Sequence, residues 1–284
     1  MLGKQIFGVR SDFEIAYLGM TGVQFRNYVE SRLILQFNGP FGVNSYATQD
    51  VISLYRTLRE GEPLSQESQK VLKIIIELGK ASDEDIHRRV GGLKITVRAI
   101  VKELFSRCYI AKEFEGKYVF VGEKYRKEEA YERLIMASAA EIGYVNTDLF
   151  SRIIGFQDTN VARYLEDLLS QGKLSKVAFS DLRSVVYCLP ETAAELGKAN
   201  HGDVRRIISP KDLLYRAYEK IFRNETRGRG MHYFISSGRI ECAFSAQKNG
   251  RLMEVTSVTG NRKAIKDLKS ELTRLGFSVN IKES

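Results

Sequence analysis

The side chains with the clearest capacity for chemistry in this sequence are cations on one face of a predicted helix. Residues 95–107 place apolar side chains at positions i, i+3, i+4 and i+7, and this spacing predicts a helix whose buried face is Val97, Ile100, Val101 and Leu104. The opposite face carries Lys94, Thr96, Arg98 and Lys102. Arg and Lys donate hydrogen bonds to guanine and to phosphates in the DNA major groove. The pattern predicts contact with duplex DNA, and an ordinary solvated helix face is the alternative.

Further polar side chains could extend this DNA-binding surface. They are Lys112 and Lys117 in a predicted hairpin, Asn160 and Arg163 at the start of a later helix, and Arg227 and Arg229 in a basic loop with glycines. Each can donate a hydrogen bond to a phosphate or a base. Double-stranded DNA is therefore the partner that the sequence predicts.

The usual signatures of catalysis and of cofactor binding do not occur in the sequence. It has no GxxxxGK(S/T) motif, and no HExxH motif includes its three widely separated histidines, His87, His201 and His232. The three cysteines lack the CxxC spacing of a zinc site, so we expect buried free thiols at Cys108, Cys188 and Cys242.

One pair of carboxylates could belong to a nuclease. Glu241 and Glu254 fall on adjacent predicted strands, but Thr256 stands where that arrangement needs a lysine. We therefore expect no catalytic residue, no metal and no cofactor, and the residues favour a binding protein over an enzyme.

The helix that carries the cations belongs to an order of elements that occurs twice. In residues 67–125 an amphipathic helix is followed by a short helix over 83–90, the helix over 95–107 and a strand–turn–strand. Residues 126–190 repeat three helices and a hairpin. This order is typical of a winged helix-turn-helix, so the sequence predicts two such domains in tandem.

The second copy differs in charge from the first. Its third helix presents Glu166 and Asp167 beside Arg163, and these carboxylates would repel phosphates. Lys and Arg number 8 against 9 Asp and Glu in residues 126–190, whereas they number 12 against 9 in residues 67–125. The second copy could bind DNA or could dock a protein partner, and the sequence leaves both open.

The flanking segments complete a mainly α fold with an α+β part. Residues 1–66 are predicted as a helical lead-in, in which Phe25, Tyr28, Val29, Leu33 and Phe37 would share one helix face. Residues 191–208 are predicted as a linker, and residues 209–284 as a small α+β domain in which sequence periodicity changes to two. Residues 191–284 have 18 Lys and Arg against 11 Asp and Glu, and a basic surface favours a polyanion.

The expected location follows from hydropathy. No run of 18 apolar residues occurs, and the first residues do not have the pattern of a signal peptide. We expect a cytoplasmic protein with no membrane partner.

The order of these parts resembles two related groups of proteins. Tandem winged helices behind a helical lead-in resemble the C-terminal region of the large helicase-related (Lhr-type) proteins and the winged-helix alkylpurine DNA glycosylases. The most specific point of likeness is Leu35-Gln36-Phe37-Asn38. In those glycosylases a Gln-x-Gln or Gln-x-Asp motif carries the catalytic function, so the resemblance implies that role for Gln36 and for Asn38, which replaces the second Gln or Asp.

The sequence thus predicts a DNA-binding protein, acting in transcription regulation or in DNA repair and processing. Two alternatives remain, a glycosylase-like repair enzyme and a winged-helix module for protein assembly.

Overall fold

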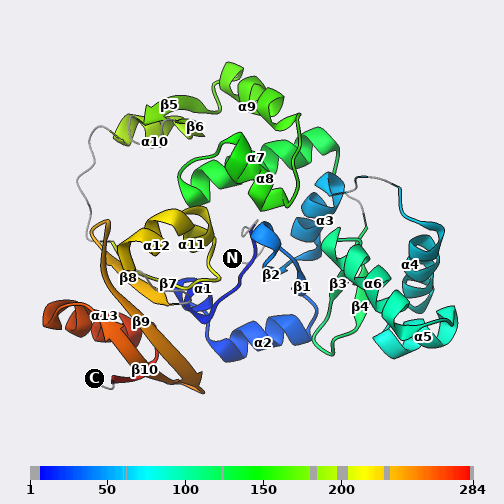
Figure 1. The fold of residues 1–284 in the computed structure, drawn as a ribbon, viewed down its shortest axis with the longest axis horizontal. Helices are drawn as coiled ribbons and strands as arrows, with labels where there is room; N and C mark the ends of the chain where they lie inside the picture. The colour runs from blue at the N-terminus through cyan, green and yellow to red at the C-terminus, as the bar shows by residue number, and fades with distance from the viewer. Residues whose placement is uncertain are drawn as a thin grey trace. The chain divides into compact units, whose positions relative to one another are not determined.

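The computed structural model describes residues 7–59, 61, 63–122, 125–179, 184–196, 204–226 and 231–281. The chain forms two units, one from Met1–Arg10 with Val23–Ala194 and the other from Ser11–Gly22 with Glu195–Ser284 (Figure 1). Helices and strands occur in both units, so the mixed α and β composition predicted from the sequence is confirmed.

The first unit contains a four-stranded sheet with the order β2-β1-β3-β4. Its strands are β1 (Leu35–Asn38), β2 (Asn44–Ala47), β3 (Ile110–Lys112) and β4 (Tyr118–Phe120). A short 3-10 helix, η2 (Pro40–Gly42), joins β1 to β2, and α3 (Gln49–Leu58) follows with Val51, Ile52, Tyr55 and Leu58 buried.

The predicted helix that included both Phe25 and Phe37 is wrong in its second half. Helix α2 (Gly22–Glu30) ends before β1 begins. Apolar and polar residues alternate in β1, and the sheet buries Leu35 and Phe37 on one face. This burial favours a strand over a continued helix, because a period of two places every second residue on the same face.

The first helix–hairpin segment, residues 66–120, has the predicted order of elements. It consists of α4 (Gln66–Leu78), α5 (Asp83–Val90), α6 (Lys94–Ser106), β3 and β4. Ser65 and Ser82 cap α4 and α5 through their side chains. Val97, Val101 and Leu104 of α6 pack into a core with residues of α4, α5 and the hairpin. Helix α6 therefore exposes its polar side, as predicted from its periodicity.

The second helix–hairpin segment, residues 127–188, repeats this order. Its elements are α7 (Lys127–Ile142), α8 (Thr147–Ile154), α9 (Val161–Ser170), β5 (Ser175–Phe179) and β6 (Ser184–Cys188). The side chain of Asn146 caps α8 by accepting a hydrogen bond from the amide of Leu149. Tyr131 of α7 is buried and stacks on Tyr164 of α9, with ring centroids 4.1 Å apart.

In both segments, one residue from outside the hairpin pairs with its second strand in the same way. Ala81 pairs with Tyr118 of β4, and Val145 pairs with Tyr187 of β6, through two backbone hydrogen bonds in each case. Each bridging residue directly precedes the residue that caps the second helix of its segment. The two segments therefore share this pattern of backbone hydrogen bonds as well as the order of their elements.

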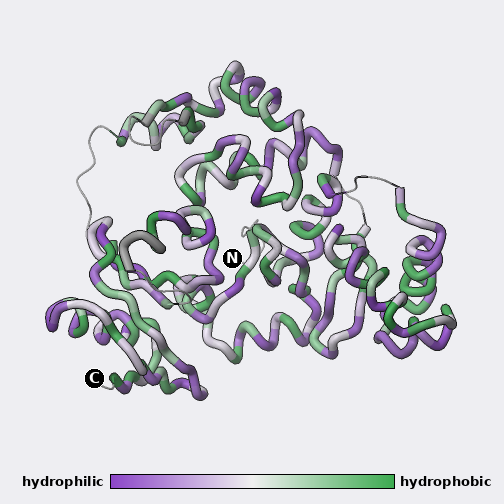
Figure 2. Tube along the Cα trace, viewed as in Figure 1, coloured by the Kyte–Doolittle hydropathy of each residue, from purple (hydrophilic) through white to green (hydrophobic). Residues whose placement is uncertain are grey.

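The second unit is a five-stranded sheet with the order β11-β10-β9-β8-β7. Its elements are α1 (Asp12–Tyr17), β7 (Arg205–Ile208), α11 (Leu213–Ala217), α12 (Glu219–Thr226), β8 (His232–Ser236), β9 (Arg239–Asn249), β10 (Leu252–Thr259), α13 (Arg262–Arg274) and β11 (Ser278–Ile281). Helices α1 and α13 contribute to one hydrophobic core, and α11 and α12 to another. Figure 2 shows hydrophobic and hydrophilic residues alternating along these helices, as expected where one face is buried.

The segment predicted as a linker, residues 191–208, contains regular structure. Helix α10 (Pro190–Glu195) lies at its start and β7 at its end. Ile207 and Ile208 of β7 are buried in the sheet of the second unit, because each packs into one of the two cores. None of the helices in the described ranges has the length and the apolar character needed to cross a bilayer.

Candidate functional site

Strand β1 presents Gln36 and Asn38 on one face of the four-stranded sheet. Leu35 and Phe37 are buried on the other face, whereas Gln36 and Asn38 are only partly buried. Gln36 lies opposite Tyr46 of β2 and opposite Lys112 of β3. Directly paired residues point to the same face of a sheet, with their Cβ atoms about 5 Å apart. The side chains of Gln36, Tyr46 and Lys112 therefore project from neighbouring positions on this face.

Asn38 is held in one orientation. Its side-chain Nδ2 donates a hydrogen bond to the carbonyl oxygen of Ser106, at the end of α6, over 3.2 Å. A carbonyl oxygen can only accept, so the amide nitrogen must face Ser106 and the amide oxygen must face away from it. The amide oxygen of Asn38 can then accept a hydrogen bond from a ligand or a water molecule.

The guanidinium of Arg59, which follows α3, joins the end of β1 to both helix–hairpin segments. Arg59 is only 6% exposed. Its Nη1 donates to the carbonyl oxygen of Asn38, and its Nη2 donates to that of Gly39 at 3.0 Å. Its Nε donates to the carbonyl oxygen of Ile154 in α8 at 2.7 Å, and Nη1 lies 3.4 Å from that of Ser106. A buried charge needs such partners, so Arg59 fixes the position of β1 relative to α6 and α8.

Two neighbouring residues support this arrangement. A Cβ atom on Gly39 would lie 2.2 Å from Oγ of Ser45, so only glycine fits there. Nη1 of Arg59 also donates to Sγ of Cys108 at 3.2 Å. Burial raises the pKa of the Cys108 thiol, which remains neutral and is no nucleophile. Cys108, Cys188 and Cys242 are all buried and free, as predicted.

The predicted DNA-binding face of α6 is exposed. Lys94, Thr96, Arg98 and Lys102 all have exposed side chains. The acidic residue on this side of the helix, Glu103, accepts from Ser68 and pairs with Arg107 at 3.2 Å. The sequence did not predict that Leu93 and Ile95 are 73% and 75% exposed at the start of the same helix. The start of α6 therefore combines cations with unburied apolar side chains.

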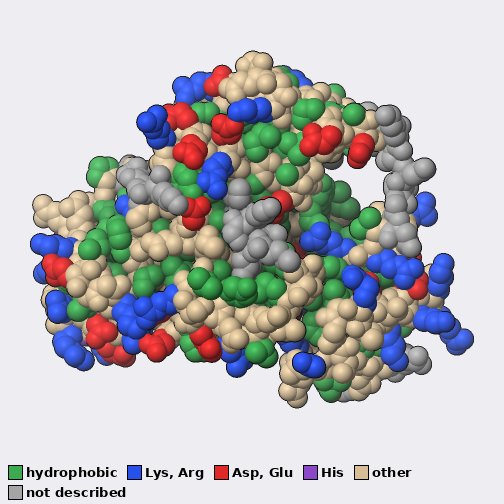
Figure 3. Space-filling model, turned by 180° about the vertical axis from the view of Figure 1, so that it is seen from behind, with side chains coloured by type: hydrophobic (Ala, Val, Ile, Leu, Met, Phe, Trp, Pro, Cys, Tyr) green, Lys and Arg blue, Asp and Glu red, His purple; other side chains and the backbone are tan. Residues whose placement is uncertain are grey.

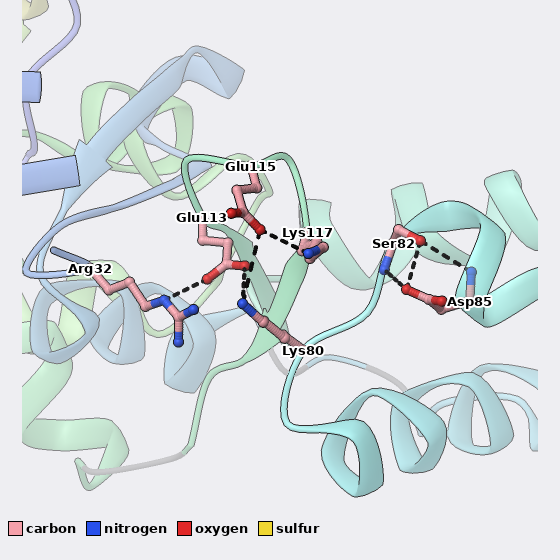
Figure 4. A network of polar contacts seen from close by, with 7 residues as sticks. All are labelled: Arg32, Lys80, Ser82, Asp85, Glu113, Glu115 and Lys117. Atoms are coloured by element: carbon pink, nitrogen blue, oxygen red, sulfur yellow. Dashed lines mark hydrogen bonds and ion pairs between the residues drawn. The ribbon is translucent and has the colours of Figure 1, made fainter. Parts of the chain in front are cut away.

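The turn between β3 and β4 is held by ion pairs (Figure 4). Glu113 pairs with Arg32 at 2.7 Å and with Lys80 at 3.5 Å. Lys117 pairs with Glu115 at 2.8 Å, and this hydrogen bond raises the pKa of Lys117 and lowers that of Glu115. Lys117, which the sequence suggested as a phosphate contact, is thus engaged within the turn.

Lys112, the other candidate in the hairpin, is placed differently. Its Nζ lies over the ring of Tyr118, 5.1 Å from the centroid, on the face of the sheet that carries Gln36. The structure therefore brings Lys112 next to Gln36 and leaves Lys117 in the turn.

The candidates in the second helix–hairpin segment are engaged locally. Asn160 bonds to Asp158 at 2.9 Å, and the guanidinium of Arg163 lies 4.9 Å from the ring centroid of Tyr164. Glu166 accepts hydrogen bonds from Tyr187 and from Lys176, and these lower its pKa. The outward side of α9 therefore carries an acidic residue that is already paired with its own hairpin.

The remaining candidates lie in the second unit. Arg227 and Arg229 fall outside the described residues. Helix α13 exposes a row of cations, Arg262, Lys263, Lys266 and Lys269. Figure 3 shows Lys and Arg side chains lying among Asp and Glu side chains over much of the face it presents.

The structure does not assemble the other catalytic possibilities. Glu254 of β10 lies opposite Gln247 of β9, six residues from Glu241, a separation of about 20 Å along a strand. Burial lowers the pKa of His232 to about 4, so this imidazole is neutral. Within the described ranges, no group of three or more His, Cys, Asp or Glu side chains is placed to hold a metal ion.

The fold of the chain is similar to that of a solved DNA glycosylase. It is similar to the solved structure of the DNA glycosylase AlkZ from Streptomyces sahachiroi, with a TM-score of 0.66 and 12% sequence identity. The similarity covers 99% of this chain and 92% of that chain. No protein-family model matches the sequence, and no curated protein matches it. At this level of identity the likeness concerns the fold.

Sequence reasoning alone missed two features of the site. Arg59 was not singled out from the sequence, because its partners are carbonyl oxygens from distant segments that no sequence pattern marks. The strand that carries Gln36 and Asn38 had a signal, the alternation of polar and apolar residues over 35–38, but the helical spacing of the preceding residues hid it.

Proposed function

We propose that this chain is a glycosylase-like DNA-repair protein that binds damaged duplex DNA and acts on a base at Gln36 and Asn38. The observation that carries the proposal is the pair of partly buried amides on one face of β1, where Gln36 is paired with Lys112 and the backbone of Asn38 accepts a hydrogen bond from the buried Arg59. Its support is the similarity of fold to a DNA glycosylase over nearly the whole chain. Tandem winged helices would supply the contacts to the duplex, with α6 as the recognition helix.

The chemistry of two amides limits the substrate. Neither Gln36 nor Asn38 can take a proton from water at neutral pH, but their carbonyl oxygens can orient a water molecule and stabilise positive charge on the sugar. Such a site suits a base that leaves without help. A purine nucleotide alkylated at N7 or N3 carries a positive charge on the base, so breaking the bond between C1′ and N9 returns the electron pair to the ring and releases a neutral base. Water adds to C1′ and its proton passes to the solvent.

A direct test uses a duplex that contains one 7-methylguanine. The wild-type protein should release the base, detected by chromatography or as an alkali-labile site. Gln36→Ala and Asn38→Ala should each lower the single-turnover rate by about 100-fold, since each removes a preorganised polar group. Asn38→Asp should lower the rate less than Asn38→Ala, because a carboxylate can orient water and accept its proton, although it cannot donate to the carbonyl oxygen of Ser106 as the amide does.

The control is Lys70→Ala, an exposed residue on α4 far along the chain from β1, which should behave as wild type. A wild-type protein that binds the duplex and leaves the 7-methylguanine intact would refute the proposed enzyme.

The second candidate function is duplex binding without base release, in transcription regulation or DNA processing. The exposed cations of α6 favour it. If Arg98 reads a base, Arg98→Ala should weaken binding to a preferred sequence by about 1–3 kcal/mol and binding to other sequences by less. If Arg98→Ala weakens binding to all sequences equally, Arg98 does not read a base. A protein-assembly module would instead show no salt-sensitive binding to any duplex in a gel-shift titration, and would dock a protein partner through the acidic second segment.

A further inference from the structure

An aromatic side chain stands exposed at the tip of the β3–β4 hairpin. Phe114 is 56% exposed, between two glutamates whose carboxylates are both paired. An exposed phenyl ring gains nothing from the fold of its own segment, since its apolar surface stays in water. A contact with a partner outside the chain would bury this apolar surface.

The backbone of this tip is fixed. The amide of Glu113 donates to the carbonyl oxygen of Lys117, and the amide of Gly116 donates to that of Glu113, each over 2.9 Å. Gly116 has a φ of 77°, a left-handed conformation that glycine adopts without strain. A rigid tip loses little conformational freedom when it binds, so a ring mounted on it is pre-organised for contact.

The charges around the ring are arranged so that phosphates are not repelled. Glu113 pairs with Arg32 and Lys80, and Glu115 pairs with Lys117 at 2.8 Å and with Lys80 at 3.9 Å (Figure 4). Three basic side chains thus offset two acidic ones. The side chains around Phe114 are therefore neutral to weakly positive in sum.

The tip also lies close to the proposed base-binding face. Lys112 of β3 is directly opposite Gln36 of β1, and Phe114 follows Lys112 by two residues. Phe114 lies just past the end of β3 and, because β1 and β3 are antiparallel, on the side of Gln36 that faces away from Asn38. Two residues span at most about 7 Å, and the Cα atoms of paired residues are about 5 Å apart, so the Cα atom of Phe114 lies within about 12 Å of that of Gln36.

We propose that Phe114 stacks on a nucleobase next to the one held at Gln36 and Asn38, filling the gap that an extruded or missing base leaves in the duplex. The ligand class is the exposed face of an unstacked base in duplex DNA. Apolar side chains that insert between base steps are a general means of holding DNA open, and stacking is tolerant of base identity. This inference rests on the proposed function, because it requires a base to be displaced at β1.

The test compares binding to two 20-base-pair duplexes that differ at one position, one intact and one with a tetrahydrofuran abasic site beside a 2-aminopurine. Wild-type protein should bind the abasic duplex more tightly and should quench the 2-aminopurine fluorescence by stacking. Phe114→Ala should weaken binding to the abasic duplex about tenfold, with at most a twofold effect on the intact duplex and an unchanged salt dependence. Phe114→Tyr should stay within twofold of wild type.

Phe156→Ala is the matched control, because Phe156 is also an exposed phenylalanine, at 37%, in the second helix–hairpin segment. It should match wild type on both duplexes. Circular dichroism checks that each variant folds, as expected for substitutions at exposed positions.

The outcomes separate the two claims. If wild-type protein prefers the abasic duplex and Phe114→Ala binds it equally tightly with the same quenching, stacking by Phe114 is refuted and the proposed function stands. If wild-type protein shows no preference for the abasic duplex, the base-displacing function fails and the stacking role fails with it.

Discussion

The two helix–hairpin segments share one order of elements and one pattern of backbone bridging, but they differ in charge at equivalent positions. Aligning the buried residues of α6 with those of α9 places Lys102 where the second segment has Glu166, and Lys94 where it has Asp158. Lys102 is exposed on α6, whereas Glu166 bonds to Tyr187 and Lys176 of its own hairpin. Two segments with the same order of elements thus carry opposite charges at these aligned positions.

The segments also differ in what they pack against. The hairpin of the first segment extends the sheet of β1 and β2, so it places Lys112 beside Gln36. The hairpin of the second segment forms a two-stranded sheet of its own. The second segment instead contacts the rest of the unit through α7 against α3, α8 against η2, and the bond from Arg59 to Ile154. The first segment therefore contributes strands to the sheet that carries Gln36 and Asn38, whereas the second segment supports the end of β1 through α8 and Arg59.

The largest effect should come from removing that support. Arg59→Met deletes several hydrogen bonds from a charged donor, each worth about 1.5–3 kcal/mol when lost, so we expect destabilisation of about 3 kcal/mol or more. For a unit of this size the midpoint of thermal unfolding should fall by about 6–12 °C. Lys70→Met, an exposed change on α4, is the control and should alter stability by less than about 0.5 kcal/mol. Equal melting temperatures for the two variants would contradict the role of Arg59.

An intermediate effect should separate the two third helices in DNA binding. If α6 lies against phosphates, Lys102→Ala should reduce the slope of log affinity against log salt by about one unit. Glu166→Ala, at the equivalent position of α9, should leave the slope unchanged. Gel-shift titrations at two or more salt concentrations measure both. Equal slopes for Lys102→Ala and wild type would show that α6 is a solvated face, and a steeper slope for Glu166→Ala would show that α9 also lies against DNA.

The smallest effect concerns the titration of Glu166. Hydrogen bonds from Tyr187 and Lys176 stabilise its charged form, so its pKa in the folded protein lies below the ordinary value of 4.5. The contribution of these bonds to stability is present above that value and is lost as the pH falls through the lower, folded pKa. Carbon-13 NMR of the carboxylate should show this shift, and Tyr187→Phe should move the pKa back towards 4.5. A Glu166 that titrates at 4.5 in wild type would mean that these bonds are not maintained in solution.

Local sequence patterns predicted the elements that are self-contained. Helices α5 and α6, the hairpin of β3 and β4, and the buried side of α6 follow from periodicity, glycine turns and capping residues within a short stretch of chain. The sequence also led to Gln36 and Asn38, through a resemblance, and to the exposed cations of α6. Local pattern failed at residues 31–38, where helical spacing continued past the end of α2 into a strand that is stabilised by partners elsewhere in the chain.

The sequence by itself determined that this chain repeats a unit of three helices and a hairpin, that the first copy is cationic on one helix, and that no familiar nucleotide or metal motif is present. Only the tertiary structure decided that Gln36 shares a face with Lys112, that Lys117 is engaged by Glu115, and that Arg59 links three separate segments. The physical reason is range. Periodicity and capping act over one or two helical turns, whereas strand register and the partners of a buried charge depend on residues tens of positions away.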